Sequence, residues 1–258
     1  MTSHVSSLLV TGACGAVGRL VLPQLCRDQP ARLTDRAAGE VEGVPVEAVD
    51  LLDFPALLQA MQGCDAVLHL AIASGREFPD RTHAPDAIAA FDTATLEVNT
   101  RGVYHLFEAA RRAGVRRVIY MGSQTLFQGY PTARERARAG LPPCPVKLYA
   151  VTKWFGEEIG ALYHRQYGLE VITLRLGQPY PLGTAHDAAC FATAESRQWA
   201  VHRDDIVAGI QAALATPVPY AVCPLVSRGE PYSLDLSEGE RIGYTPAYVF
   251  HPGGVEKI

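Results

Sequence analysis

The stretch SSLLVTGACGAVGRL, residues 6–20, decides the fold expected for this chain. Its first residues form an apolar run typical of a buried β-strand, and the residues after the glycines form an amphipathic helical pattern. A glycine-rich turn between a strand and a helix lets the backbone approach a pyrophosphate, and the helix N-terminus receives the phosphate charge. We therefore predict a dinucleotide-binding turn. Its predicted contacts are Gly12, Gly15, Ala16, Val17 and Gly18.

An acidic residue ends the next predicted strand. Asp35 closes the stretch ARLTD, at the position from which a carboxylate accepts hydrogen bonds from the adenosine ribose hydroxyls. Because a carboxylate at this position repels a 2′-phosphate, Asp35 favours NAD over NADP as the cofactor. Arg36 lies beside it and is also expected at the cofactor, which keeps NADP open.

Short apolar runs alternate with helical patterns as far as Gly177. This alternation predicts an α/β fold: a doubly wound parallel sheet, Rossmann-like, with a small C-terminal substrate lobe. After Gly177 the rhythm breaks, and the following 22 residues read as irregular. We expect residues 1–177 and 201–217 to form the dinucleotide-binding core, and residues 178–200 and 218–258 to form the lobe.

One charged segment with two prolines, residues 74–91, reads as a long loop before a helical pattern that starts at about Asp92. Long loops at the carboxyl edge of such a sheet are often lids over a site. A solvated insertion fits the composition equally well, so both interpretations stay open.

The composition of the chain argues against several classes of binding partner. It has 258 residues, a formal net charge of −4 and no basic run, so neither nucleic acid nor an anionic membrane is the expected partner. No apolar stretch approaches the roughly 18 residues of a membrane helix. The six cysteines are scattered without a C-x-x-C pair, which favours free thiols in the cytoplasm. No metal is expected, because no His, Asp and Glu cluster has metal-ligand spacing.

The stretch KLYAVTKWFGEE, residues 147–158, carries the predicted chemistry. Tyr149 and Lys153 are four residues apart in a helical pattern, so they share one helix face. A lysine ammonium beside a phenol stabilises the phenolate and should lower the tyrosine pKa from about 10. Tyr149 is then predicted to exchange a proton with a substrate hydroxyl or carbonyl.

Taken in order, these motifs resemble one family. TGxxGxxG, Asp50-Leu51, the sequence HLA at residues 69–71 and the Tyr-x-x-x-Lys pair are similar to the extended short-chain dehydrogenase/reductase superfamily, which includes NAD-dependent epimerases and dehydratases. The resemblance runs from about Leu8 to Pro217. It implies that Asp50 and Leu51 hold the adenine. The further cofactor contacts that it implies are Leu70, Ala71, Ile72, Tyr149, Lys153 and Leu176.

The same resemblance assigns further roles. Ser123, at the end of the strand VIYMGS, would orient the substrate oxygen, and Lys153 would bind the nicotinamide ribose. Asn99 matches an asparagine associated with this site, although an amide that only packs a helix fits as well. Helices near residues 92–113 and 148–167 pair across a dimer interface in similar proteins, which implies a homodimer.

The substrate is expected to be a small free sugar, because the chain lacks the long C-terminal region that clasps nucleotide diphosphates in related enzymes. Among short members it resembles uronate dehydrogenases, through LYAVTKWFGE, LRLG, WAVHRDDI and IGYTPAY. That resemblance implies that Ser74, Ser123 and Arg175 contact the sugar, with Arg175 pairing a carboxylate. Gln124 and Thr125 stand where those enzymes carry Asn and His, and are also expected at the substrate.

Three functions fit these observations. The first is an NAD-dependent dehydrogenase that oxidises a sugar, such as a uronic acid, to its lactone. The second is a sugar epimerase that returns its NAD oxidised, and the third is a cofactor-binding sensor without turnover. Accumulation of NADH separates the first from the second, and the intact Tyr149–Lys153 pair argues against the third.

Overall fold

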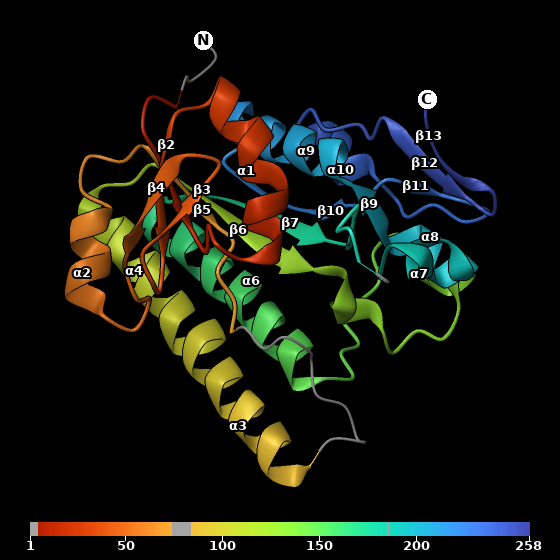
Figure 1. The fold of residues 1–258 in the computed structure, drawn as a ribbon, viewed down its shortest axis with the longest axis horizontal. Coiled ribbons are helices and arrows are strands. Elements are labelled where there is room, and N and C mark those ends of the chain that lie inside the picture. The colour runs from red at the N-terminus through yellow and green to blue at the C-terminus, as the bar shows by residue number, and fades with distance from the viewer. Residues whose placement is uncertain (1–4, 74–83, 185) are drawn as a thin grey trace.

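Eight strands form one sheet at the centre of the molecule (Figure 1). The computed structural model describes residues 5–73, 84–184 and 186–258. Neighbouring strands pair in parallel from β10 to β4, and β3 is antiparallel to β4. The spatial order of the strands is β10 (Tyr220–Leu225), β7 (Glu170–Leu176), β6 (Arg117–Ser123), β5 (Ala66–His69), β1 (Leu8–Thr11), β2 (Ala31–Asp35), β4 (Val44–Ala48) and β3 (Gly39–Val41). This order confirms the predicted doubly wound, Rossmann-like sheet.

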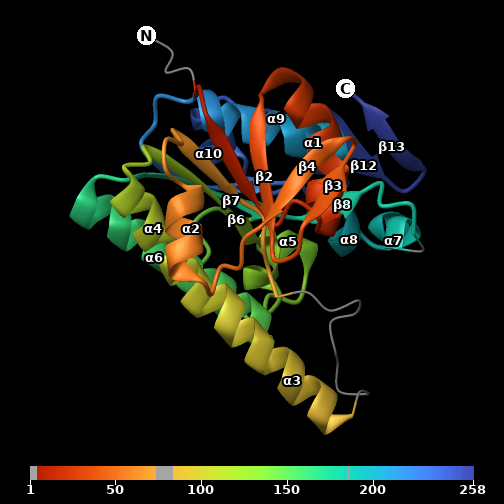
Figure 2. The ribbon, with the colours of Figure 1, turned by 60° about the vertical axis from the view of Figure 1, so that its left-hand side comes forward.

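Helices cover both faces of the sheet, as Figures 1 and 2 show. Because every residue of β1, β5 and β6 is buried, these strands supply apolar side chains to both faces. One core lies beneath α1 and α9, and the other lies beneath α2, α4 and α6. The bounds of these helices are Ala16–Asp28 for α1, Phe54–Ala60 for α2, Val103–Ala113 for α4, Leu148–Tyr167 for α6 and Arg203–Ala215 for α9.

The helical pattern expected from Asp92 begins earlier in the structure. Helix α3 spans Pro85–Leu96 and continues through a π-helical turn, Glu97–Gly102, into α4. Pro85 occupies the first helical position, where its missing N–H leaves no hydrogen bond unmade. The expected loop over 74–91 is therefore too long at its C-terminal end. Figure 2 shows α3 extending away from the body of the molecule.

The segment after Gly177, which the sequence suggested was irregular, contains regular elements. They are β8 (Gln178–Tyr180), α7 (His186–Ala192), α8 (Ala194–Trp199) and β9 (Ala200–His202). Capping explains α8, because Thr193 and Ser196 exchange hydrogen bonds at its start. β8 pairs with β9 in a small separate sheet.

The C-terminal segment divides between the large sheet and the smaller elements around it. Strand β10 pairs with β7 and forms an edge of the large sheet, although residues 218–258 were all expected in the lobe. The division into core and lobe otherwise stays a prediction. The remaining elements are η2 (Gln124–Phe127), α5 (Ala133–Arg136), β11 (Arg228–Gly229), α10 (Ser237–Arg241), β12 (Tyr248–His251) and β13 (Gly254–Lys257).

Candidate active site

The turn between β1 and α1 has the geometry that a close approach to phosphate requires. Gly12 has a φ of +77°, and a Cβ there would lie 2.4 Å from the backbone nitrogen of Ala71. A Cβ on Gly18 would lie 2.2 Å from the carbonyl oxygen of Ala13, so α1 packs directly on the turn. Gly15 precedes α1, whose first residues, Ala16 and Val17, present the helix N-terminus.

Asp35 lies at the carboxyl end of β2, beside this turn. Its Oδ2 accepts a hydrogen bond from the backbone N–H of Cys14 at 2.9 Å, and its Oδ1 accepts one from Arg36 N–H at 2.7 Å. The carboxylate is therefore held in place by the backbone of the glycine turn.

A cavity of about 130 Å³ opens next to this carboxylate. The predicted cofactor residues that line it are Gly12, Asp35, Arg36, Asp50, Leu51, Ala71 and Ile72. Asp50 is oriented by the N–H of Leu52, which donates to its Oδ1 at 2.8 Å. An apolar wall with two carboxylates at its rim fits the adenosine half of a dinucleotide, whose ribose hydroxyls donate hydrogen bonds.

Hydroxyl groups gather at the carboxyl end of β6. Ser123 ends this strand and caps the short helix η2 by accepting from Thr125 N–H at 3.2 Å. The two hydroxyl oxygens, Ser123 Oγ and Thr125 Oγ1, lie 2.9 Å apart. Leu176 is the partner of Ser123 across the β6–β7 ladder, so it lies beside the same site.

Tyr149 lies in the first turn of α6, and its pKa is higher than expected. Burial raises the pKa of Tyr149 to about 12, and a hydrogen bond with Ser123 lowers it in part. The prediction that Lys153 lowers this pKa is wrong for the structure described. Lys153 Nζ lies 5.9 Å from the centre of the Tyr149 ring and donates to the Met121 carbonyl at 2.8 Å.

Lys153 is fully surrounded by the protein. Burial lowers its pKa to about 7, and Glu157 opposes that fall. The charged form of Lys153 is therefore less favourable than that of an exposed lysine. Burial thus disfavours the charged forms of both Tyr149 and Lys153, and Tyr149 is hydrogen-bonded to Ser123 at the carboxyl end of β6.

Glu157 was not predicted from the sequence, although it repeats the spacing of the pair: it lies four residues after Lys153 on α6. It is buried, and Arg175 on β7 donates to both of its carboxylate oxygens. The Arg175 guanidinium also lies 5.1 Å from the centre of the Phe127 ring. An (i, i+4) carboxylate after the lysine is the signal that could have revealed it.

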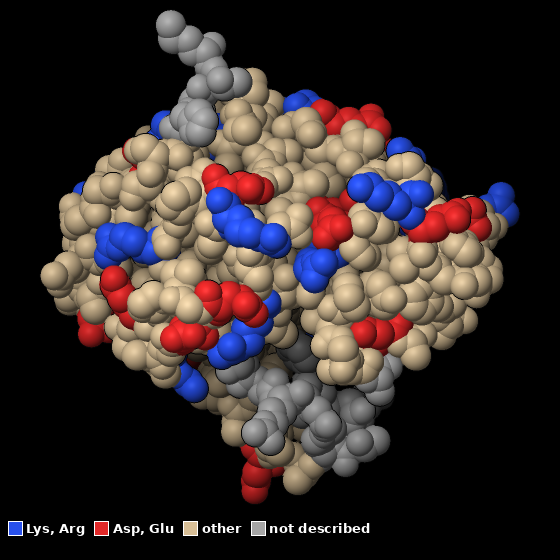
Figure 3. Space-filling model, turned by 45° about the horizontal axis from the view of Figure 1, so that its top comes forward, with Lys and Arg blue, Asp and Glu red and all other residues tan. Residues whose placement is uncertain are grey.

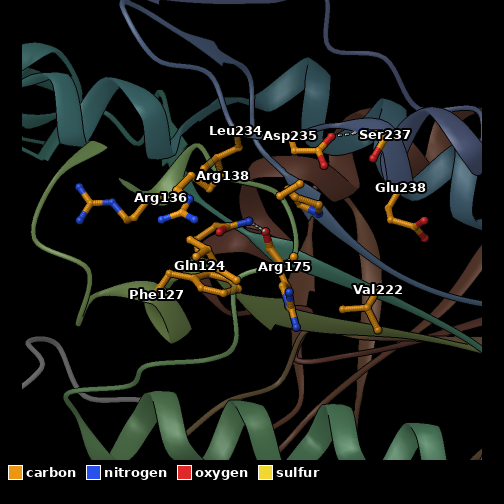
Figure 4. A pocket seen from close by; sticks show the side chains of 14 residues that line it. Gln124, Phe127, Arg136, Arg138, Arg175, Val222, Leu234, Asp235, Ser237 and Glu238 are labelled. Atoms are coloured by element: carbon orange, nitrogen blue, oxygen red, sulfur yellow. Dashed lines mark hydrogen bonds between the residues drawn. The ribbon is translucent and has the colours of Figure 1, made fainter. Parts of the chain in front are cut away.

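Gln124 and Arg175 line a second cavity of about 230 Å³ (Figure 4). Gln124 is buried, and its Nε2 donates to the Arg175 carbonyl at 3.2 Å. Phe127, Arg138 and Glu238 also line this cavity, whereas Ser123, Thr125 and Tyr149 do not. The residues predicted to contact substrate are thus divided between two places.

Asn99 connects α6 to the segment after β5. Its Oδ1 accepts from Ala73 N–H at 2.9 Å, and its Nδ2 donates to Thr152 Oγ1 at 3.3 Å. Thr152 in turn donates to the Tyr149 carbonyl at 2.8 Å. Asn99 therefore links the segment after β5 to the first turn of α6 through Thr152. Leu70 is buried at the end of β5, and Ser74 lies outside the described residues.

The described residues also bear on metal binding and on membrane insertion. In residues 5–73, 84–184 and 186–258, no three or more His, Cys, Asp or Glu side chains are grouped to hold a metal ion. Over the same ranges, no helix is both long and apolar enough to cross a membrane. On the face shown in Figure 3, acidic and basic side chains are interspersed.

Proteins that are similar to this chain include named sugar dehydrogenases. Uronate dehydrogenase of Pseudomonas putida is 29% identical over 250 residues, which cover 95% of this chain and 85% of that protein. L-Arabinose 1-dehydrogenase (NAD(P)(+)) of Haloferax volcanii is 33% identical over 184 residues, 67% of each protein. A crystal structure of a mutant uronate dehydrogenase from Agrobacterium tumefaciens, complexed with NAD, has a TM-score of 0.78 and 27% identity. That match covers 97% of this chain and 87% of the other.

A family match extends over most of the sheet. Residues 8–198 match the NAD dependent epimerase/dehydratase family, which agrees with the glycine turn, the Asp35 carboxylate and the Tyr149–Lys153 pair. The predicted family, its enzymatic character and its NAD cofactor are thereby confirmed. The chain belongs to the NAD dependent epimerase/dehydratase family.

Proposed function

We propose that this enzyme uses NAD to oxidise the anomeric carbon of a small free sugar to a lactone. The observation that carries the proposal is that Tyr149 is hydrogen-bonded to Ser123, with Lys153 Nζ 5.9 Å from the centre of the Tyr149 ring. A cavity lined by Gly12, Asp35 and Asp50 supports a bound dinucleotide. Relatives that cover much of the chain support it, since they are by name dehydrogenases of uronate and of L-arabinose.

The proposed mechanism assigns one task to each side chain. Gly12, Asp35 and Asp50 hold the dinucleotide, which supplies the hydride acceptor when it is bound. Ser123 fixes the sugar hydroxyl by a hydrogen bond, and Tyr149 takes its proton. Because burial disfavours the Tyr149 phenolate, a charged Lys153 is needed to stabilise this phenolate, which then accepts the proton of the sugar hydroxyl as the hydride leaves for the cofactor.

The sugar itself is proposed to contact Ser123 and Thr125, whose hydroxyl groups lie together near Tyr149. Hydroxyl groups both donate and accept hydrogen bonds, so this pair suits a polyhydroxylated ligand. Ser74 is proposed as a further contact by resemblance alone. Uronic acids and neutral aldoses are the two substrate classes that the relatives' names suggest.

The test is an NAD⁺ reduction assay with uronic acids, neutral aldoses and hydroxy acids, followed by product analysis. We expect NADH to accumulate with at least one sugar, and a lactone to form. An isomerised sugar without NADH would favour an epimerase, and no turnover with any sugar would contradict the proposal.

Tyr149→Phe tests the assigned base directly. We expect a loss of kcat of about 10³-fold, because a phenylalanine cannot transfer a proton. NAD affinity, measured by calorimetry, should remain near that of the wild type. The matched control is Tyr167→Phe, which removes a phenol oxygen from the exposed far end of the same helix. Wild-type turnover in Tyr149→Phe would refute the assignment.

We also propose a homodimer formed through α6 and the α3–α4 helix. Large apolar side chains are exposed along these helices: Leu96, Tyr104, Val151, Trp154, Phe155, Leu162 and Tyr167. On α6, Val151 is three residues before Trp154 and four before Phe155, and Leu162 follows Phe155 by seven, which places these four side chains on one face. Analytical ultracentrifugation should show a dimer for the wild type and a monomer for Trp154→Glu. A monomeric wild type would contradict this proposal.

Finally, we propose that the enzyme works in the cytoplasm. All six cysteines are free thiols in the structure, and Cys64, Cys190 and Cys223 are buried. Free thiols persist where the environment is reducing. Immunodetection in cell fractions would test the location, and recovery outside the cytoplasmic fraction would contradict it.

A further inference from the structure

The carboxylate of Glu157 lies one helical turn beyond the catalytic lysine. Both residues are on α6 and both are buried, with 4% of Glu157 and 2% of Lys153 exposed. Residues four apart share a helix face, so the carboxylate and the ammonium lie on the same side of α6. Burying a carboxylate is costly unless a partner compensates its charge.

That partner is Arg175, which reaches across from β7. Its Nε donates to Glu157 Oε1 at 3.0 Å and to Oε2 at 3.2 Å, and its Nη2 donates to Oε2 at 2.8 Å. The Phe127 ring lies against the same guanidinium. Arg175 is thus held by two neighbours, and its bidentate geometry is already used inside the protein. Burial raises the pKa of Glu157, and Arg175 counteracts that rise.

The groups that face Lys153 come from three elements. They are the Met121 carbonyl and the Tyr120 ring on β6, His69 on β5, and Tyr149 and Glu157 on α6 itself. Burial holds the pKa of His69 at about 3 and that of Tyr120 well above its ordinary value, so both are neutral at pH 7. Glu157 is the only carboxylate among these groups.

We propose that the Glu157–Arg175 ion pair is a positioning unit that keeps Lys153 charged for catalysis, and that Arg175 is committed to Glu157 and does not bind a substrate carboxylate. The proposal rests on the dehydrogenase function proposed above, which requires a charged Lys153. It revises the role that resemblance gave to Arg175. Substrate charge is then selected elsewhere in the site.

The two parts of the unit act in sequence. Arg175 keeps Glu157 ionised in an environment that favours its neutral form, and the ionised carboxylate favours the ammonium form of Lys153. The charged ammonium then stabilises the Tyr149 phenolate, which accepts the substrate proton and becomes a neutral phenol. When the Glu157 carboxylate is removed, burial still lowers the pKa of Lys153 and no nearby carboxylate opposes that fall.

The charge of Lys153 can be measured without substrate, because the chain contains only three lysines: Lys147, Lys153 and Lys257. Protein labelled at the lysine ε-carbon gives three NMR signals, and Lys153→Arg identifies the one of interest. In Glu157→Gln we expect the titration midpoint of Lys153 to fall by about 1 pH unit, as for loss of a nearby opposite charge. Lys147 and Lys257 are exposed and serve as internal references.

Glu158→Gln is the matched control, since it removes an exposed carboxylate from the next position of the same helix. It should leave the Lys153 midpoint within a few tenths of a pH unit. An equal midpoint in wild type and Glu157→Gln would overturn the proposal. Such a result would leave the dehydrogenase assignment intact, because no turnover is measured.

Breaking one member of a buried ion pair can prevent folding, so the double variant Glu157→Gln/Arg175→Met removes both charges together. We expect the Lys153 midpoint to fall in this variant as it does in Glu157→Gln. The kcat of the double variant should be no lower than that of the worse single variant, because the two residues act as one unit. Multiplied losses would show that they act independently and would overturn the proposal.

The claim that Arg175 pairs with Glu157 and does not bind a substrate carboxylate is tested with one charged and one neutral sugar that the enzyme oxidises. In Arg175→Met we expect kcat to fall about tenfold for both, with the ratio of their KM values unchanged. A rise of KM for the uronate alone would show that Arg175 binds the substrate carboxylate, and would overturn this part of the proposal. If only one class of sugar is oxidised, the inhibition constant of the other sugar as a competitive inhibitor replaces its KM value in this comparison.

Discussion

The cofactor half and the substrate half of this site are built differently. In the cofactor half, the turn after β1 and the end of β2 use backbone groups, such as Cys14 N–H, to fix Asp35 beside a cavity. In the half that we propose binds the substrate, Lys153 is buried on α6, and Glu157 on the same helix pairs with Arg175 on β7.

Because of this difference, substitutions should affect the two halves by different physical mechanisms. The cofactor half depends on the space between main-chain segments, as at Gly12 and Ala71. The substrate half depends on charges in an environment that opposes ionisation, as at Lys153 and Tyr149. Substitutions should therefore act through steric overlap in the first half and through protonation in the second.

The largest effect is expected from Gly12→Ala in the cofactor half. The new Cβ would lie 2.4 Å from the backbone nitrogen of Ala71, in a backbone conformation with a φ of +77°. We expect a loss of about 3 kcal/mol in the free energy of unfolding, measured with urea, and loss of NAD binding. The control Gly114→Ala has a similar φ of +74° with no atom within 4 Å of its Cβ. It should lose only about 1 kcal/mol.

Equal losses in these two variants would show that backbone strain alone is responsible. The close approach of Gly12 to Ala71 would then have no structural role, and the contrast between the two halves would weaken.

A smaller effect, and one that depends on pH, is expected from Lys153→Met. Burial lowers the Lys153 pKa from its ordinary 10.5 to about 7, so the unfolded chain binds more protons between these values. The contribution of Lys153 to stability is therefore complete above pH 10.5 and is lost progressively as the pH falls from 10.5 to about 7, below which no more is lost. Between pH 7 and pH 9, the wild type should gain about 2 kcal/mol relative to Lys153→Met.

Urea unfolding at pH 7 and pH 9 measures this difference. The variant Lys147→Met removes an exposed lysine at the start of the same helix and should follow the wild type. The tyrosine acts in the opposite direction at higher pH, because the raised pKa of Tyr149 removes stability as the pH rises through 10 towards 12. Parallel curves for wild type and Lys153→Met would contradict the burial of Lys153 as an amine.

Sequence alone was sufficient for the sheet and for the positions of the cofactor motifs. Alternating apolar runs identified the parallel strands, and α6 was expected from Leu148 to Tyr167, as the structure has it. Gly12 and Asp35 were predicted together because a turn and the next strand end are local features. Local patterns failed at α3, where Pro85 starts a helix seven residues before Asp92.

The ion pairs and pKa values of the substrate half could not be predicted from local sequence patterns. The partner of Glu157 is Arg175, which lies 18 residues away and meets it only when β7 packs beneath α6. The pKa values of Tyr149 and Lys153 depend on burial, which spacing does not report. The spacing of Tyr149 and Lys153 therefore predicted that they would be near each other, but not the direction of the Tyr149 pKa shift.

The smallest effect is expected in the cofactor half, from Asp35→Asn. This substitution removes the charge of the side chain and keeps its shape. The introduced amide would retain an oxygen for the Cys14 N–H, so the turn should keep its geometry. Without the carboxylate, the ribose hydroxyls lose a charged acceptor and a 2′-phosphate is no longer repelled. We expect the ratio of the NADP and NAD dissociation constants to fall about tenfold, close to 1.4 kcal/mol.

Titration calorimetry with each cofactor measures this ratio, and Glu47→Gln is the control. Glu47 is an exposed carboxylate on the neighbouring strand β4, it pairs with Arg32 at 3.6 Å, and it does not line the cofactor cavity. Its substitution should leave the ratio within about twofold, because exposed charges at a distance are screened by solvent and salt. Equal changes in the two variants would mean that general surface charge sets the cofactor preference. A fall confined to Asp35→Asn would assign the preference to the one carboxylate that the glycine turn holds in place.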